Sequence, residues 1–219
     1  MRLGFNEAND RFCQGHTVMQ DLELCEKYGF DCIDIQSECL NRDLEKGIVT
    51  IEELGAWFAT HHLKMLSYNA LCFFNMKQTA EEKQAVMDEL DEIIRRCNIL
   101  GCKMIVVVPS QDMKARGLQP TRKEIREDAV AVLKEMVKKV EPHGIKLSLE
   151  FCGAPDMTIN RFEDAYAIVE AVDSPLVGVT LDQYHFYAMG SGWESLEKAD
   201  GKKIFVWHLN GTEDMPCGA

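Results

Sequence analysis

The sequence predicts a (β/α)8 barrel, the TIM-barrel fold, with seven strand–helix units visible and the eighth missing from this chain. Three observations predict it. Short apolar runs alternate with stretches of helical periodicity, polar side chains stand at the ends of the runs, and no glycine-rich phosphate loop follows the first run. The alternation favours parallel strands with helical crossovers, and the polar ends favour a barrel over a doubly wound sheet.

Seven short runs are predicted as strands from their apolar and β-branched content. They cover residues 2–6, 30–36, 63–69, 103–108, 145–150, 176–182 and 203–208. The polar residues at or just past their ends are Asn6, Gln36, Asn69, Ser110, Glu150, Asp182 and His208. In a barrel of parallel strands these C-terminal ends face one rim, where such folds place their chemistry.

The helices between the runs are predicted from their start signals and their apolar stripes. Thr17, Thr50, Thr79 and Thr121 each stand three residues before a Gln or Glu, the spacing of the capping box, and Asn160 with Glu163 is a close relative. Gly29, Gly101 and Gly144 are placed to end three helices. Two stripes have helical spacing: Val86, Leu90, Ile93, Ile94, Cys97 and Leu100, then Ile125, Ala129, Val132, Met136 and Val140.

The length sets one constraint on the barrel. The 219 residues are enough to bury the core of one domain, but a closed barrel has eight strands and typically ~250 residues. We therefore interpret residues 1–219 as a single TIM-barrel domain that is truncated at its C-terminus. An open seven-stranded barrel is the alternative, and the aggregation hazard of an exposed edge strand weighs against it.

Composition excludes several classes of protein. A net charge of −12 without a basic block disfavours nucleic-acid binding. No apolar run approaches the ~18 residues of a membrane span, and the first residues lack a secretory signal pattern. The nine cysteines include no CxxC pair, which favours the reduced thiols of a cytoplasmic protein. The sequence leaves open whether the chain forms a homo-oligomer.

Glu150, Asp182 and His208 form the candidate site. They end three consecutive runs and lie roughly 30 residues apart, about the length of one strand–helix unit. Taken singly, the three residues are more often a loop charge, a helix N-cap and a core histidine, respectively. Because they occupy equivalent positions in three consecutive units, we expect their side chains to converge and to bind a divalent metal ion.

Side-chain alternation along the strands supports this expectation. In each of the three runs, the candidate residue lies on the side opposite the bulkiest apolar residues. In the last run, His208 should share its side with Val206 and Ile204, while Trp207 and Phe205 face the helices.

The segments around these residues resemble a known family. LEFCGAPD around Glu150, LDQYH around Asp182 and WHLNG around His208 are similar to segments of the sugar phosphate isomerase/epimerase family of xylose-isomerase-like TIM barrels. That family includes inosose isomerases and dehydratases, ketohexose 3-epimerases and hydroxypyruvate isomerases. The resemblance spans the chain in its strand–helix order, with the sharpest motifs in residues 145–210.

The resemblance implies a ligand set for one divalent ion. Family members use a Glu, an Asp, a His and a second Glu, and the first three match Glu150, Asp182 and His208. The second Glu belongs to the last strand, which we expect to be missing, and neither Glu213 nor Asp214 replaces it. Mn²⁺, Co²⁺, Zn²⁺ and Mg²⁺ are all compatible with mixed carboxylate and imidazole ligands.

The resemblance also implies substrate-binding residues. His185, the histidine of the DxxH motif, is expected to hold a substrate oxygen, and Asp156 is expected to bind substrate hydroxyls. Asn69, at the end of the third run, is a further substrate-binding candidate.

The implied activity is a metal-dependent isomerase or epimerase that acts on a sugar or keto-polyol. Glu150 would remove a proton next to a carbonyl, and the ion would stabilise the resulting enediolate. A dehydratase on the same site and a non-catalytic sugar-binding module remain alternatives. An apurinic endonuclease of the endonuclease IV type is disfavoured by the charge and by Asn69, where a histidine would be needed. Without a strong phosphate-binding loop, unphosphorylated substrates are favoured.

Overall fold

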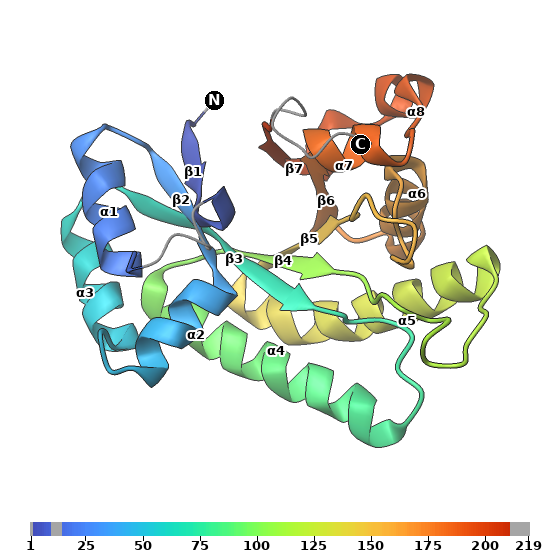
Figure 1. The fold of residues 1–219 in the computed structure, drawn as a ribbon, viewed down its shortest axis with the longest axis horizontal. Helices are drawn as coiled ribbons and strands as arrows, with labels where there is room; N and C mark the ends of the chain where they lie inside the picture. The colour runs from blue at the N-terminus through green and yellow to red at the C-terminus, as the bar shows by residue number, and fades with distance from the viewer. Residues whose placement is uncertain (1, 10–14, 211–219) are drawn as a thin grey trace.

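The computed structural model describes residues 2–9 and 15–210, in which seven parallel strands form one curved sheet inside a layer of helices (Figure 1). The strands are hydrogen-bonded in chain order, each parallel to the next. Their bounds are β1 (Gly4–Asn6), β2 (Cys32–Gln36), β3 (Lys64–Cys72), β4 (Met104–Val108), β5 (Lys146–Glu150), β6 (Val177–Asp182) and β7 (Ile204–His208). The predicted barrel architecture is confirmed, with all seven runs as strands.

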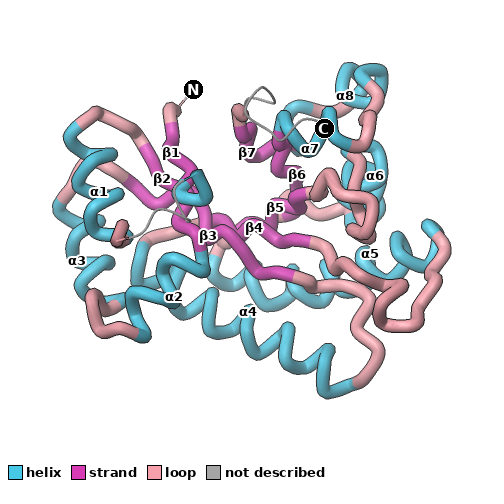
Figure 2. Tube along the Cα trace, viewed as in Figure 1, coloured by secondary structure: helices cyan, strands magenta, loops and turns pink. Residues whose placement is uncertain are grey.

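Helices cover the outside of this sheet, as Figure 2 shows in cyan around the magenta strands. They are α1 (Val18–Lys27), α2 (Ser37–Glu45), α3 (Ile51–Thr60), α4 (Ala80–Leu100), α5 (Arg122–Val140), α6 (Phe162–Val172), α7 (Gln183–Ala188) and α8 (Trp193–Lys198). The described residues also form three short 3-10 helices: η1 (Glu7–Asn9), η2 (Glu141–His143) and η3 (Gly201–Lys203). Among the described residues, no helix is long and apolar enough to cross a membrane.

The helix starts follow the predicted capping chemistry in four cases. Thr17, Thr50, Thr79 and Thr121 are the N-caps of α1, α3, α4 and α5, each with both hydrogen bonds of the capping box. The fifth prediction was wrong, because Arg161 is the N-cap of α6 and makes no capping bond. The Asn160 amide instead donates to the backbone oxygen of Ala154 at 3.1 Å, where it ties down the loop after β5.

The hydrophobic core lies between the helices and the outer face of the sheet. All six residues of the stripe predicted within α4 are buried, and Gly101 ends this helix in the left-handed conformation with φ of 70°. In α5, Leu133 is buried in place of Val132, which is only half-buried. The outward residues of β5, Leu147 and Leu149, are fully buried in the same layer.

The inner face of β5 and β6 carries polar side chains that form a hydrogen bond with each other. The hydroxyls of Ser148 and Thr180 lie 2.6 Å apart, and both residues are fully buried. This pair forms one layer below Glu150 and Asp182, because side chains two residues apart share a face of a strand. Hydrogen bonding between the hydroxyls removes the cost of burying them unpaired.

A β-bulge in β7 overturns one prediction about side-chain direction. Val179 pairs with Ile204, but the next residue, Thr180, pairs with Val206, so Phe205 is an extra residue in β7. The bulge turns the Phe205 ring towards the inner face, where Lys146 Nζ lies 4.6 Å from its centroid. Ile204 moves to the outer side, contrary to the alternation expected from the sequence.

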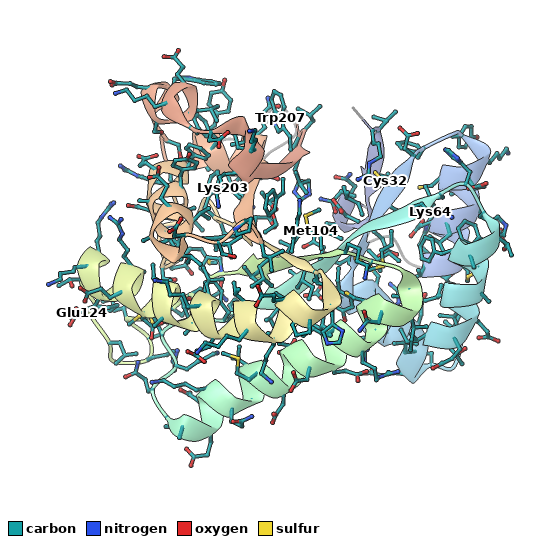
Figure 3. The ribbon with its side chains drawn as sticks, turned by 180° about the vertical axis from the view of Figure 1, so that it is seen from behind. Cys32, Lys64, Met104, Glu124, Lys203 and Trp207 are labelled. Atoms are coloured by element: carbon teal, nitrogen blue, oxygen red, sulfur yellow. The ribbon has the colours of Figure 1, made fainter. Side chains whose placement is uncertain are left out.

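Beyond the bulge the predicted directions hold. His208 is buried and pairs with Asp182, whereas Trp207, labelled in Figure 3, is 63% exposed. The prediction that Asn69 ends the third strand was also wrong. Leu71 and Cys72 continue the pairing of β3 with Val107 and Val108 after a register shift.

Four cysteines of the described residues, Cys32, Cys97, Cys102 and Cys152, carry free thiols. Cys13 and Cys217 lie outside the described residues, as do Glu213 and Asp214.

Gly178→Ala should destabilise the fold by about 1–3 kcal/mol through overpacking. A Cβ at this position would meet the backbone oxygen of Lys203 at 2.6 Å and the Phe205 ring at 2.7 Å. Gly201→Ala is the matched control, since a Cβ there meets no atom within 4 Å. Urea denaturation followed by circular dichroism measures both changes, and equal midpoints for the two variants would contradict the predicted packing around the bulge.

Candidate metal centre

The three predicted ligands meet at one end of the barrel. Glu150 and Asp182 are the last residues of β5 and β6, and His208 is the last residue of β7. His208 Nδ1 lies 3.0 Å from Glu150 Oε1 and 3.7 Å from Asp182 Oδ2. All three residues are buried, with 5–7% of their surface exposed. The expected convergence of strand ends thus brings two carboxylates and an imidazole together in a place largely shielded from water.

A fourth polar side chain reaches this cluster from the helix that follows β6. Asp182 is the N-cap of α7, and its Oδ1 accepts a hydrogen bond of 2.9 Å from the backbone N–H of His185. Capping fixes the start of α7 and places the His185 ring beside the carboxylates. Glu150, Asp182 and His185 offer ligand atoms that all lie within 4.8 Å of one another.

One nitrogen of the His185 ring lacks a hydrogen-bond partner in the part of the chain that the structure describes. Its Nδ1 atom is buried and has no hydrogen-bond partner among the described residues. A buried nitrogen in this state costs free energy unless a ligand satisfies it. The missing partner of His185 Nδ1 can be a metal ion or a hydroxyl of a bound molecule.

Glu150 and His208 each shift the pKa of the other. Burial alone would raise the pKa of Glu150, but the hydrogen bond and charge of His208, together with His185, outweigh burial and lower this pKa. Burial alone would lower the pKa of His208, but the hydrogen bonds to Asp34 and Glu150 outweigh it and raise this pKa to about 10. At neutral pH the ionised Glu150 carboxylate thus lies beside a His208 imidazolium.

The donor set suits a divalent ion of intermediate softness. Carboxylate oxygens and imidazole nitrogens bind Zn²⁺, Mn²⁺ and Co²⁺. Exchange of the imidazolium proton for a divalent ion would raise the buried positive charge by one, which offsets more of the negative charge of the carboxylates. Glu150, Asp182 and His208 can supply three ligands. His185 lies close enough to contact either the ion or a molecule bound to it.

Two side chains of this region were missed in the sequence. Asn210 Nδ2 donates to Asp182 Oδ2 at 2.6 Å, and Asp34 Oδ2 lies 3.0 Å from His208 Nε2. Asn210 lies in the segment WHLNG, two residues past His208, and its place in that motif is its signal in the sequence. Asp34 lies in the strand CIDIQ, all of whose residues are buried. A charged residue between two isoleucines of a predicted strand is the signal in the sequence that could have identified it.

The remaining substrate-binding candidates lie apart from these contacts. Asn69 is buried in β3, where it pairs with Gln36 of β2 and Val106 of β4. Asp156 is exposed in the loop after β5, and its backbone oxygen accepts a hydrogen bond from Asp112. Neither side chain forms a hydrogen bond with the cluster in the described part of the chain, so both roles stay predictions.

In protein stripped of metal, His208 should stabilise the fold most strongly at acidic to neutral pH. Its folded pKa of about 10 exceeds the unfolded value of ~6.5. The stabilisation is therefore fully present below pH ~6.5 and is lost as the pH rises towards 10. Chemical denaturation of the wild type and of His208→Gln in excess chelator should show a stability difference that shrinks between pH 6.5 and pH 9.5. A difference that stays constant or grows would refute the ion pairing described here.

Known proteins match the chain over nearly all of its length. The family model described as xylose isomerase-like TIM barrel matches residues 22–218. Inosose isomerase of Bacillus subtilis (strain 168) is 41% identical, and that of Bacillus velezensis is 40% identical; each match covers 100% of this chain and 76% or 75% of the relative.

Solved structures agree with these matches. A 1.8 Å crystal structure of the IolI protein with a bound zinc atom superimposes with a TM-score of 0.90 and 41% identity, over 100% of this chain and 76% of that one. A D-psicose 3-epimerase crystallised with D-fructose has a TM-score of 0.67 at 16% identity, over 84% of this chain and 64% of that one, and shows the fold alone. Family model, relatives and barrel agree: the chain belongs to the xylose isomerase-like TIM barrel family.

Proposed function

We propose that this protein is a metal-dependent sugar isomerase that acts on an inosose or a related keto-polyol by removing a proton next to the carbonyl. The observation that carries the proposal is the cluster formed by the buried Glu150, Asp182 and His208 and the half-buried His185 at the end of the barrel where the strands terminate. Relatives named inosose isomerase, at 40–41% identity over the full chain, support an enzyme of this class.

A divalent metal ion is part of the proposal. The zinc atom bound by the similar IolI structure supports it, and so does the unsatisfied Nδ1 of His185. Glu150, Asp182 and His208 would hold the ion. When bound, it would polarise the substrate carbonyl and stabilise the negative charge of an enediolate.

Glu150 has the properties of the base. Its pKa is lowered, so the carboxylate is ionised at neutral pH and can accept a proton. The C–H electron pair of the substrate then forms the carbon–carbon double bond of the enediolate, and the carbonyl oxygen takes the negative charge. Return of the proton to the former carbonyl carbon gives the isomer, as the hydroxyl proton of the enediolate passes to the negatively charged oxygen and the hydroxyl oxygen becomes the new carbonyl. Protonation of the original carbon from a donor on its other face gives the epimer.

The other side chains of the cluster are proposed to hold and orient the metal ion and the substrate. Asp182 is tied to the N-terminus of α7 through Oδ1 and to Asn210 through Oδ2, so its carboxylate cannot rotate freely. His185 stands one helical turn from this cap with a free ring nitrogen and is the proposed partner of a substrate hydroxyl. These fixed contacts would present the substrate carbon to Glu150 without reorganisation of the site.

Glu150→Gln should abolish exchange of the substrate C–H proton with solvent. The amide keeps the size of the side chain but cannot take a proton. Incubation of the metal-loaded protein with an inosose in D₂O, followed by NMR, measures deuterium on the carbon next to the carbonyl. Glu141→Gln, a change of an exposed glutamate in η2, is the control and should exchange at the wild-type rate.

Metal content of each variant must be measured in the same samples. Exchange at the wild-type rate in metal-loaded Glu150→Gln would remove Glu150 from the role of base. A wild-type product that is lighter by one water would instead identify a dehydratase that uses the same base.

His185→Ala should raise KM by about tenfold and leave kcat less affected, because loss of one hydrogen bond to the substrate costs about 1–2 kcal/mol of binding. Steady-state kinetics with a fixed saturating metal concentration measures the change. A large loss of kcat with unchanged KM would show that His185 acts in the chemical step or on the metal instead.

A further inference from the structure

A buried carboxylate from the first half of the barrel reaches the candidate centre. Asp34 lies in the middle of β2, in a strand whose five residues are all buried. Its own exposure is 3%, and its Oδ2 atom lies 3.0 Å from His208 Nε2 on β7. The contact joins strands that are not neighbours in the sheet order, so it spans the interior of the barrel.

The two nitrogens of the His208 ring therefore have different partners. Nε2 faces Asp34, whereas Nδ1 faces Glu150 and Asp182. A carboxylate accepts a hydrogen bond only from a protonated nitrogen, so in the imidazolium both ring nitrogens donate to carboxylates. Nδ1 alone faces two candidate ligands, so it is the nitrogen that would give up its proton to a metal, while Nε2 keeps its proton on Asp34.

We propose that Asp34 is a positioning residue, which fixes the ring orientation and tautomer of His208 so that Nδ1 is presented to the metal ion. The inference rests on the proposed function, because it concerns the metal centre named there. Hydrogen bonding of the second nitrogen to a carboxylate raises the basicity of a histidine ligand and removes its rotational freedom.

Asp34 is itself held in place. The Ser67 hydroxyl donates to Asp34 Oδ1 at 2.5 Å, and Ser67 is fully buried in β3. The two residues are direct partners in the pairing of β2 with β3. Since Ser67 occupies one carboxylate oxygen, the other is directed to His208. Ser67, Asp34 and His208 thus form a chain of hydrogen bonds that leads from β3 through β2 to the candidate centre on β7.

A purely structural role would also explain a buried ion pair, and the two roles predict different results. If Asp34 only stabilised the barrel, its replacement would lower stability without a specific effect on metal binding. Asp43 provides the matched control. It is equally buried, and its carboxylate accepts hydrogen bonds from the backbone of Val18 and from Arg42, away from the cluster.

The test compares the metal affinity of the wild type, Asp34→Asn and Asp43→Asn. Each full-length protein is stripped of metal and titrated with Zn²⁺ in competition with a chromophoric chelator. Asp34→Asn should bind Zn²⁺ about 10–100-fold more weakly than the wild type. Asp43→Asn should bind within about twofold of the wild type at whatever stability it retains, which denaturation of the same samples reports.

The outcomes separate the inference from the proposed function. A wild type that binds no Zn²⁺ would overturn the proposed metal centre itself. A wild type that binds, with equal affinity in Asp34→Asn, would overturn the role of Asp34 alone. If Asp34→Asn does not fold, Ser67→Ala replaces it; the freed Asp34 carboxylate should then weaken Zn²⁺ binding by several-fold, and unchanged affinity would overturn the inference.

Discussion

The structure depends on the burial of charged groups at the end of the barrel. Glu150, Asp182 and Asp34 are all nearly inaccessible to water, and burial of three carboxylates in one place is costly unless a positive charge lies beside them. His208 lies between Asp34 and Glu150 and supplies that charge as an imidazolium. A proton and a divalent ion are thus competitors for one electrostatic role. The fold therefore favours a metal ion by concentrating buried negative charge at one fixed position.

Local backbone features decide where each of these groups points. The bulge at Phe205 shifts the register of β7 by one residue, and only beyond it does His208 pair with Asp182 on the inner face. The cap of α7 fixes one oxygen of Asp182, and Asn210 fixes the other. Together, the bulge, the helix cap and the Asn210 hydrogen bond leave the ligand atoms few alternative orientations.

Much of the fold was predictable because local signals were strong and mutually consistent. Threonine capping boxes, glycine helix ends and apolar stripes each report on a few neighbouring residues, and nearly all of them were correct. The convergence of Glu150, Asp182 and His208 was predictable as well, since parallel strands place equivalent ends on one rim. The bulge was not, because an extra residue is defined by the partner strand and leaves no period in its own sequence. Asp34 was missed for a related reason: its partner His208 is far away in the sequence, and no spacing rule connects β2 with β7.

The division of labour between the two halves of the barrel follows from these contacts. The candidate ligands come from β5, β6 and β7, whereas Asp34 and Ser67 come from β2 and β3. The hydrogen bond between Asp34 and His208 ties the two halves together across the interior. A ligand that binds only the assembled site stabilises the whole barrel, since binding to the folded state alone shifts the unfolding equilibrium. If Asp34 positions His208 as proposed, this carboxylate links the first half of the barrel to metal affinity in the second half, in addition to the continuous sheet that joins the two halves.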